Sequence, residues 1–122
     1  MQQPDWVTEL FHSIDNMDTR AFLNFLAPTA RFRFANGPAV AGQDAIGDAV
    51  DGFFATIGAC QHKLLDVWST GTTVICRGDV TYTRLDDSRI KLPFVNVLGM
   101  NGEKIQEYSI YIDISPLYAG HA

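Results

Sequence analysis

The 122-residue chain has little of what would place it in a specialised class of protein. It has only two cysteines, Cys60 and Cys76, too few for a disulfide framework, so we expect both to be reduced thiols. Its 9 basic residues are outnumbered by 14 acidic ones and form no cluster, which argues against nucleic acid or an anionic membrane as a partner. No stretch approaches the roughly 18 apolar residues of a membrane-spanning helix.

The first residues, Met1 to Asp5, also lack the basic region and apolar run of an export signal, which predicts a cytoplasmic protein. The length predicts one domain over residues 1–122, with enough apolar residues for a core that needs no disulfide or metal. Three scattered histidines and no cysteine pair give no metal-ligand signature. A glycine-rich phosphate loop and a nucleophile elbow are also missing, so we expect no cofactor.

Hydrophobic spacing divides the chain into helices first and strands afterwards. Apolar residues recur at helical spacing over roughly 4–15, from Asp18 to just before Pro28, and over 42–57. Alternating segments bounded by turn residues predict strands over 30–35, 60–69, 72–84, 89–99 and 103–114. The order α-α-β-α-β-β-β-β predicts an α+β fold, in which the helices pack on one face of a curved antiparallel sheet made by the last four strands.

This order resembles the nuclear transport factor 2-like superfamily, and within it the SnoaL-like proteins. The local markers are the segment 42–46, which opens the third helix, and the closing segment 107–113 with its Tyr-x-Asp. Relatives include polyketide cyclases, limonene epoxide hydrolase and ketosteroid isomerase. The resemblance spans nearly the whole chain and implies a cone-shaped domain around a deep apolar pocket, a small apolar ligand and a homodimer. One fold hosts many functions, so the reaction does not follow from it.

The catalytic residues of these relatives carry over only in part. The Arg-x-Asp pair of limonene epoxide hydrolase matches Arg77 and Asp79. Its second aspartate falls at Ile110, where the polyketide cyclases also have their acid–base residue. Its water-holding tyrosine and asparagine fall at Phe32 and Phe34, and the ketosteroid isomerase residues fall on side chains without that chemistry. We therefore expect no epoxide hydrolase activity of the limonene type.

Turn positions predict the register of the late strands. A two-residue loop over 70–71 places His62 opposite Asp79, and a four-residue loop over 85–88 places Asp79 opposite Phe94. Opposite residues share a sheet face, so we expect His62, Asp79 and Arg77 to form a catalytic cluster inside the pocket. The imidazole and carboxylate would exchange protons with a substrate, and the arginine would keep the carboxylate ionised.

A three-residue loop with a bulge at Gly102 then turns Ile110 toward the pocket. The expected lining comes from the early strand, the third helix and the late strands. It consists of Phe32, Phe34, Phe53, Thr81, Leu92, Phe94, Asn96, Tyr108, Ile110 and Ile112.

Two questions stay open from the residues alone. Alternation along 72–84 also allows Val74, Val80 and Tyr82 to face the core, with Arg77 and Asp79 in a solvated stripe. The resemblance favours the reverse, with the polar face lining the pocket and the apolar face, together with Val97, packed against a partner subunit. The function is equally open. It is either cofactor-free acid–base catalysis of isomerase, cyclase or hydrolase type on a small hydrophobic substrate, or a non-catalytic ligand-binding or dimerisation module.

Overall fold

The observed order of helices and strands is the predicted one with two short additions. The computed structural model describes residues 5–119, so residue 4 of the predicted first helix lies outside the described residues. The elements are α1 (Asp5–Asp15), α2 (Thr19–Leu23), β1 (Leu26–Phe34), β2 (Val40–Ala41), α3 (Gln43–Phe54), β3 (Ile57–Thr70), β4 (Thr73–Arg84), β5 (Arg89–Asn101), β6 (Lys104–Tyr111) and α4 (Ser115–Tyr118). The additions are β2 and α4.

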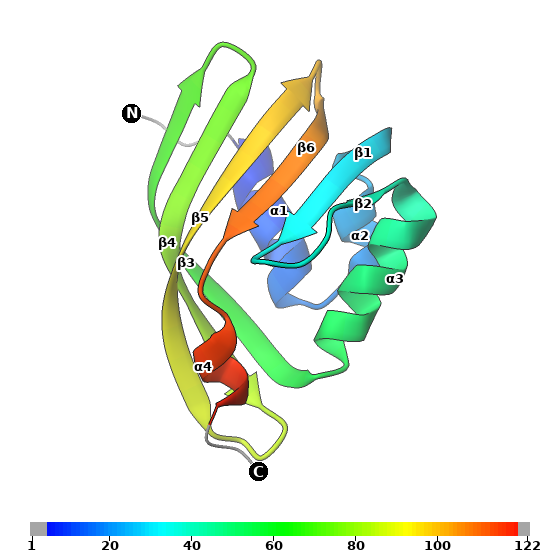
Figure 1. The fold of residues 1–122 in the computed structure, drawn as a ribbon. Helices are drawn as coiled ribbons and strands as arrows, with labels where there is room; N and C mark the ends of the chain where they lie inside the picture. Colours follow the sequence, from blue (N-terminus) through cyan, green and yellow to red (C-terminus); the bar gives the residue numbers. More distant parts are fainter. Residues whose placement is uncertain (1–4, 120–122) are drawn as a thin grey trace.

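The strands form one curved sheet in the order β2-β1-β6-β5-β4-β3, and α1, α2 and α3 lie on its concave side (Figure 1). All neighbours are antiparallel except β1 and β6, which are parallel. The predicted α+β class is confirmed, but the sheet extends beyond the last four strands. The sheet also contains β1, which pairs with β6, and the short β2, which pairs with β1. The helix α2 ends at Leu23, and β1 already begins at Leu26. Pro28 interrupts no helix and lies instead where the pairing of β1 with β6 shifts register, a position that tolerates a missing N–H.

Each long helix has one apolar face, which it buries against the sheet. In α1 the buried side chains include Val7 and, one turn later, Leu10 and Phe11, while Glu9 and His12 on the other face are exposed. In α3 the buried face carries Ile46 and Val50. These faces supply the helical half of the core. Among the described residues, no helix is long and apolar enough to cross a membrane.

Three tight turns fix the register of β3 to β6. Gly71 and Gly102 each open a two-residue loop with a positive φ, 57° and 61°, as type II′ hairpins require. Between β4 and β5 the loop has three residues and ends with Asp87 at φ 71°. The predicted loop positions and the predicted bulge at Gly102 are therefore wrong by one or two residues. The bulge of this hairpin lies further along β6, where Gln106 has no partner in β5.

A second bulge lies in β3 at Leu65. Leu64 pairs with Gly78 while Asp66 pairs with Arg77, so Leu65 is the extra residue. A Cβ atom on Gly78 would lie only 2.1 Å from the carbonyl oxygen of Lys63. The two backbones can approach this closely only because residue 78 has no side chain.

These registers turn the even-numbered side chains of β4 inward. Val74, Cys76, Val80 and Tyr82 are buried in the core. The proposed dimer face made of Val74, Val80, Tyr82 and Val97 is therefore wrong for its first three members. The other alternative, with a solvated stripe on the opposite face, is the one that the structure adopts.

Replacing Gly78 by alanine tests the close approach at the bulge. We expect Gly78→Ala to lower the free energy of unfolding by about 3 kcal/mol, because the added methyl group collides with backbone that cannot rotate away. Gly52→Ala is the matched control, since a Cβ atom at this helical position meets nothing within 4 Å. The control should gain about 0.5–1 kcal/mol from helix propensity. Equal urea midpoints for wild type and Gly78→Ala would contradict the analysis of the bulge.

Candidate functional site

A cavity of about 200 Å³ lies between the concave face of the sheet and the helices. It reaches the surface beside α3, where the exposed Ala49 belongs to its lining. The lining is almost entirely apolar or aromatic. It consists of Ile14, Phe22, Phe32, Phe34, Ala49, Val50, Phe53, Phe54, Cys60, His62, Val80, Tyr82, Phe94, Asn96, Tyr108, Ile110 and Ile112.

Aromatic rings from different elements meet around this cavity in three groups. Phe22 and Phe32 lie with their ring centroids 5.4 and 5.5 Å from that of Tyr108. On another side, the Phe53 ring lies 4.8 Å from Phe34 and 5.6 Å from Tyr82. The third group contains His62, whose ring lies 5.1 Å from Phe11 and 5.2 Å from Phe94. These tilted and edge-on contacts are the arrangements that aromatic rings prefer, and they give the cavity stiff walls.

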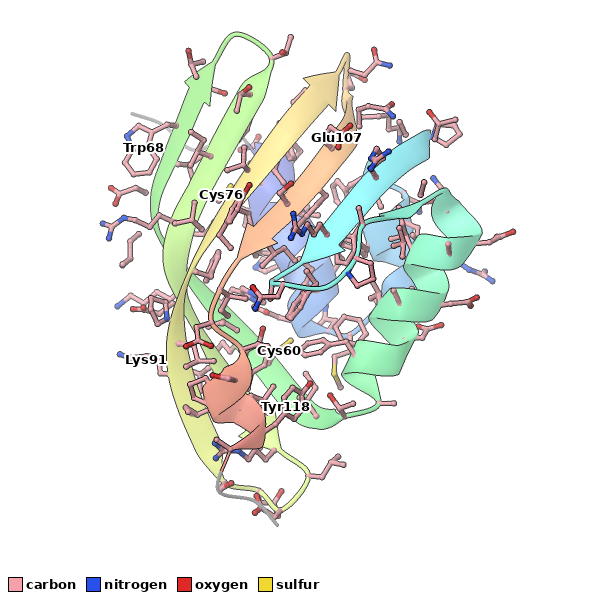
Figure 2. All side chains as sticks on the ribbon, viewed as in Figure 1. Cys60, Trp68, Cys76, Lys91, Glu107 and Tyr118 are labelled. Atoms are coloured by element: carbon pink, nitrogen blue, oxygen red, sulfur yellow. The ribbon has the colours of Figure 1, made fainter. Side chains whose placement is uncertain are left out.

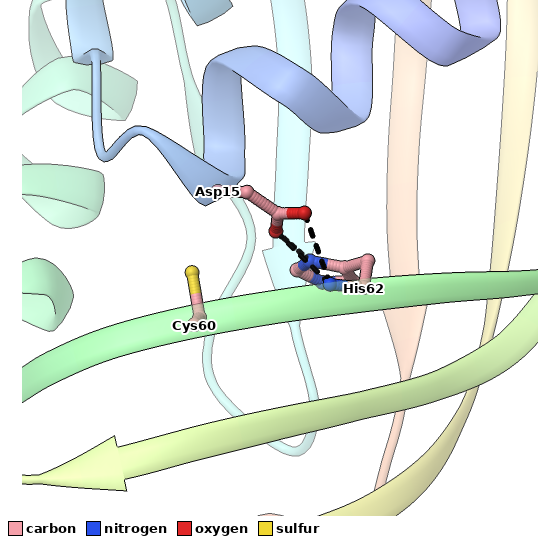
Figure 3. A group of neighbouring side chains, drawn as sticks. All are labelled: Asp15, Cys60 and His62. Atoms are coloured by element: carbon pink, nitrogen blue, oxygen red, sulfur yellow. Dashed lines mark hydrogen bonds and ion pairs between the residues drawn. The ribbon is translucent and has the colours of Figure 1, made fainter.

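The one strong polar contact at the wall joins α1 to β3. Asp15, the last residue of α1, lies with its carboxylate 2.6 Å from Nδ1 of His62 (Figure 3). The backbone N–H of His62 donates to the same carboxylate, at 3.0 and 3.1 Å from its two oxygens. Since β3 is an edge strand, Asp15 satisfies an N–H group that no neighbouring strand pairs. The His62 side chain is only 10% exposed.

This contact defines the tautomer of His62. An ionised carboxylate can only accept hydrogen bonds, so Nδ1 must carry the proton that points at Asp15. In the neutral imidazole, Nε2 is then the nitrogen with a free lone pair. No described residue hydrogen-bonds Nε2. The geometry therefore presents a base whose ring is held by Asp15 and is in tilted and edge-on contact with Phe11 and Phe94.

Cys60 lies beside this pair, but its buried thiol is unreactive. Its Sγ donates to the carbonyl oxygen of Ile14 at 3.4 Å, and Figure 2 shows the side chain pointing into the interior. Burial, with a contribution from the charge of Asp15, raises the pKa of Cys60 to about 12. Asp15, Cys60 and His62 each offer one metal-ligand atom within 4.8 Å of the others. A metal at this position would need a deprotonated Cys60 and a free imidazole nitrogen, and Nδ1 of His62 already meets the Asp15 carboxylate.

A second polar pair lies deeper in the wall. The side chain of Asn96 on β5 is buried, and its Nδ2 donates to Oη of Tyr108 on β6 over a long 3.4 Å. Burial raises the pKa of Tyr108 far above its ordinary range, so its hydroxyl stays protonated. The Oδ1 atom of Asn96 has no hydrogen-bond partner among the described residues.

The structure brings most of the predicted pocket residues together. The cavity is lined by His62 and by Phe32, Phe34, Phe53, Phe94, Asn96, Tyr108, Ile110 and Ile112. Ile110 lies opposite Asn96 of β5.

The predicted cluster of His62, Asp79 and Arg77 is wrong. His62 pairs with Val80, while Asp79 pairs with Lys63 and points to the outer face of the sheet. Arg77 lies on the outer face as well, and its Nε donates to Asp66 at 2.9 Å instead of holding Asp79. The bulge in β3 and the three-residue loop after β4 each shift the pairing by one residue, and a shift of one reverses the face of every side chain.

Two predicted lining residues also lie elsewhere. Thr81 faces outward for the same reason as Asp79, between Gln61 and Lys91. Leu92 does face inward opposite Val80, but it is packed in the core and does not line the cavity.

Sequence reasoning did not identify Asp15 as the hydrogen-bond partner of the His62 imidazole. A signal was present, because a carboxylate in the last turn of a helix opposes the helix dipole and is usually avoided there. Such a residue calls for a compensating donor from outside the helix. Which donor it would be could not be read from the spacing, since Asp15 and His62 are 47 positions apart.

The fold of this chain is shared with known proteins. Residues 7–108 match the family model described as SnoaL-like domain, and the chain belongs to this family. No curated protein matches the chain.

Several solved structures have the same fold. A protein with a ketosteroid isomerase-like fold from Catenulispora acidiphila, solved with trimethylamine, has a TM-score of 0.85 at 17% identity, covering 93% of this chain and 89% of its own. An NTF2-like protein of unknown function from Burkholderia pseudomallei has a TM-score of 0.83 at 17% identity, with coverages of 91% and 90%. An LEH-like epoxide hydrolase from M. tuberculosis has a TM-score of 0.76 at 13% identity, with coverages of 93% and 84%. At these identities the likeness shows the fold alone.

We expect the buried thiols to make the protein less stable in alkali. Burial raises the pKa of Cys60 to about 12 and that of Cys76 to about 11, from an ordinary 9.0. A raised pKa means that the folded state holds the proton longer, so this stability is complete below pH 9 and is lost as pH rises toward the folded values. We expect the free energy of unfolding to fall above that pH by up to about 1.4 kcal/mol per pH unit for each thiol.

Urea unfolding across this pH range measures the effect. The double variant Cys60→Ala/Cys76→Ala is the control and should show a clearly shallower decline. An identical decline in the two proteins would assign the alkaline lability to other groups.

Proposed function

We propose that this protein is a cofactor-free acid–base catalyst acting on a small hydrophobic molecule held in the cavity. The observation that carries the proposal is the 2.6 Å contact between Asp15 and His62 in the wall of an otherwise apolar cavity. A carboxylate that fixes the tautomer and orientation of an imidazole is a recurring arrangement in general acid–base catalysis.

The rest of the lining supports His62 as the proton acceptor. The other titratable side chains in the lining are Cys60, Tyr82 and Tyr108. Burial raises the pKa of each of them, so all three keep their protons at neutral pH. His62 is therefore the lining residue best suited to take a proton from a bound molecule near neutral pH.

The proposed chemistry is a proton transfer within the cavity. Nε2 of His62 removes a proton from a carbon or oxygen of the bound molecule, and the Asp15 carboxylate stabilises the imidazolium that forms. The imidazolium can then return the proton to another atom of the same molecule. Such a step serves an isomerisation, a cyclisation or an elimination equally well.

A second candidate is a pocket that binds a hydrophobic metabolite without turnover. It is favoured by Ile110, an apolar side chain in the lining at the position where the resemblance puts a catalytic carboxylate. The trimethylamine complex of the Catenulispora protein supports a small-molecule ligand in either case. The two candidates differ in whether His62 reacts, and an experiment can separate them.

The base is tested with 5-nitrobenzisoxazole, a flat ring whose C–H proton is removed while its N–O bond breaks, giving a coloured phenolate. We expect a saturable reaction. His62→Ala should lower kcat/KM by about 10²- to 10⁴-fold. Asp15→Asn should lower it by about 10²-fold or more, because an amide group donates to Nδ1 and so reverses the tautomer.

The matched control is His12→Ala, since His12 is exposed on the same helix as Asp15 and lies outside the cavity. It should leave kcat/KM unchanged. If His62→Ala keeps the wild-type rate while the protein remains folded, the acid–base proposal is wrong. Thermal stabilisation by small hydrophobic molecules would then support the binding candidate.

We also propose that the chain forms a homodimer through the outer face of the sheet. Leu65, Trp68 and Tyr111 are large, apolar and exposed, and Leu65 and Tyr111 line one shallow depression that crosses this face. Figure 2 shows Trp68 projecting away from the helices. An exposed apolar surface of this kind is typical of a protein–protein contact.

Light scattering at micromolar concentration should give twice the mass of the chain. Trp68→Glu should shift the protein toward monomer, because the dimer would have to bury the new charge. Leu85→Glu, in the exposed loop after β4, is the control and should leave the mass unchanged. A monomeric wild type would remove the basis of this proposal.

A further inference from the structure

Asn96 is buried without the hydrogen bonds that its side chain requires. The residue is only 2% exposed, and its cross-strand neighbours are Cys76 and Ile110, neither of which hydrogen-bonds its amide. Its Oδ1 has no partner among the described residues, and its single bond, to Tyr108, is 3.4 Å long. An unsatisfied buried amide oxygen costs about 1–3 kcal/mol, so an apolar residue would make a more stable core.

Tyr108 is incompletely satisfied as well. Its Oη accepts the bond from Asn96, and no described residue accepts the proton of its own hydroxyl. Both residues line the cavity, and between them they leave one acceptor, Oδ1 of Asn96, and two donors, the second N–H of Asn96 and the O–H of Tyr108, without a partner among the described residues. If the amide is turned by 180°, at least one donor and one acceptor of the pair still lack a partner.

A hydroxyl group complements this pair in either orientation, because it is both a donor and an acceptor. A ketone or ether oxygen can only accept, and a hydrocarbon can do neither. The rings of Phe22 and Phe32 flank Tyr108, so what surrounds the hydroxyl position is aromatic. A flat ring can pack against these side chains edge-on or offset, which is how aromatic rings prefer to meet.

We infer that Asn96 and Tyr108 form a recognition site for the hydroxyl group of a small, neutral, ring-shaped ligand of the phenol type. The cavity of about 200 Å³ has room for such a ligand. The inference names the ligand class of the cavity to which we assign acid–base chemistry. It rests on that cavity as the ligand site, but it does not require that His62 transfers a proton.

Phenol and toluene form a matched pair of probes, because they differ only in a hydroxyl against a methyl group of similar size. We expect calorimetry at pH 7 to show phenol binding to the wild-type protein at least tenfold more tightly than toluene. Anisole, whose oxygen cannot donate, should bind no more tightly than toluene. Equal affinities for phenol and toluene would overturn the inference, and this comparison needs no variant.

The double variant Asn96→Leu/Tyr108→Phe separates recognition from structure. It should still bind toluene but lose the preference for phenol. Because it also removes two unsatisfied polar groups, its melting temperature without ligand should rise above that of the wild type. A preference for phenol that survives in this variant would overturn the inference, and so would a fall in melting temperature, since the pair would then be a structural hydrogen bond.

The variant His62→Gln distinguishes this inference from the proposed function. It should lose the reaction with 5-nitrobenzisoxazole and keep the preference for phenol over toluene. Loss of both properties would place the hydroxyl at His62 instead of Asn96 and overturn the inference. An inactive wild type that still prefers phenol would refute the catalytic proposal alone.

Discussion

The close approach of β3 and β4 at Gly78 is the constraint on which the candidate site depends. Because residue 78 has no side chain, β3 can place the bulged Leu65 there, with the Lys63 carbonyl against the Gly78 backbone. The bulge changes the parity of pairing along β3. On the hairpin side of it, Val67 faces inward with Cys76, and on the other side His62 faces inward with Val80. Without the extra residue, His62 would lie opposite an outward-facing residue of β4 and would leave the cavity.

Once His62 is inside, the surrounding structure limits what it can do. Asp15 holds Nδ1 and at the same time satisfies an N–H group at the edge of the sheet, so one carboxylate serves both the fold and the site. Phe11 and Phe94 restrict the ring, and burial keeps the neighbouring thiol and tyrosine hydroxyls neutral. The charged residues that the family resemblance suggests as catalytic, Arg77 and Asp79, lie on the other side of the sheet. The chain thus keeps the family fold while the candidate chemistry belongs to a different pair of residues.

The cavity wall contains two polar pairs, which differ in how fully their hydrogen bonds are satisfied. Asp15 and His62 satisfy each other and stabilise the junction of α1 with β3, so a structural role and a chemical one are compatible there. Asn96 and Tyr108 do not satisfy each other fully, and their placement costs stability. A buried group that the fold would be more stable without is the stronger indication of a ligand. The weaker hydrogen bond, between Asn96 and Tyr108, is therefore the better guide to the ligand of the cavity.

The sequence by itself determined the order of helices and strands, the amphipathic faces and most of the lining, because these follow from local spacing that each segment carries. The aromatic residues at 32, 34, 53, 94 and 108 were identifiable in this way. Only the tertiary structure decided which face of β4 points inward and which carboxylate meets His62. A hairpin's register depends on whether glycine opens or closes the turn and on bulges at sites such as Leu65, and a difference of one residue exchanges the two faces. The contact between Asp15 and His62 joins a helix end to an edge strand, and it exists only after the sheet has curved around α1.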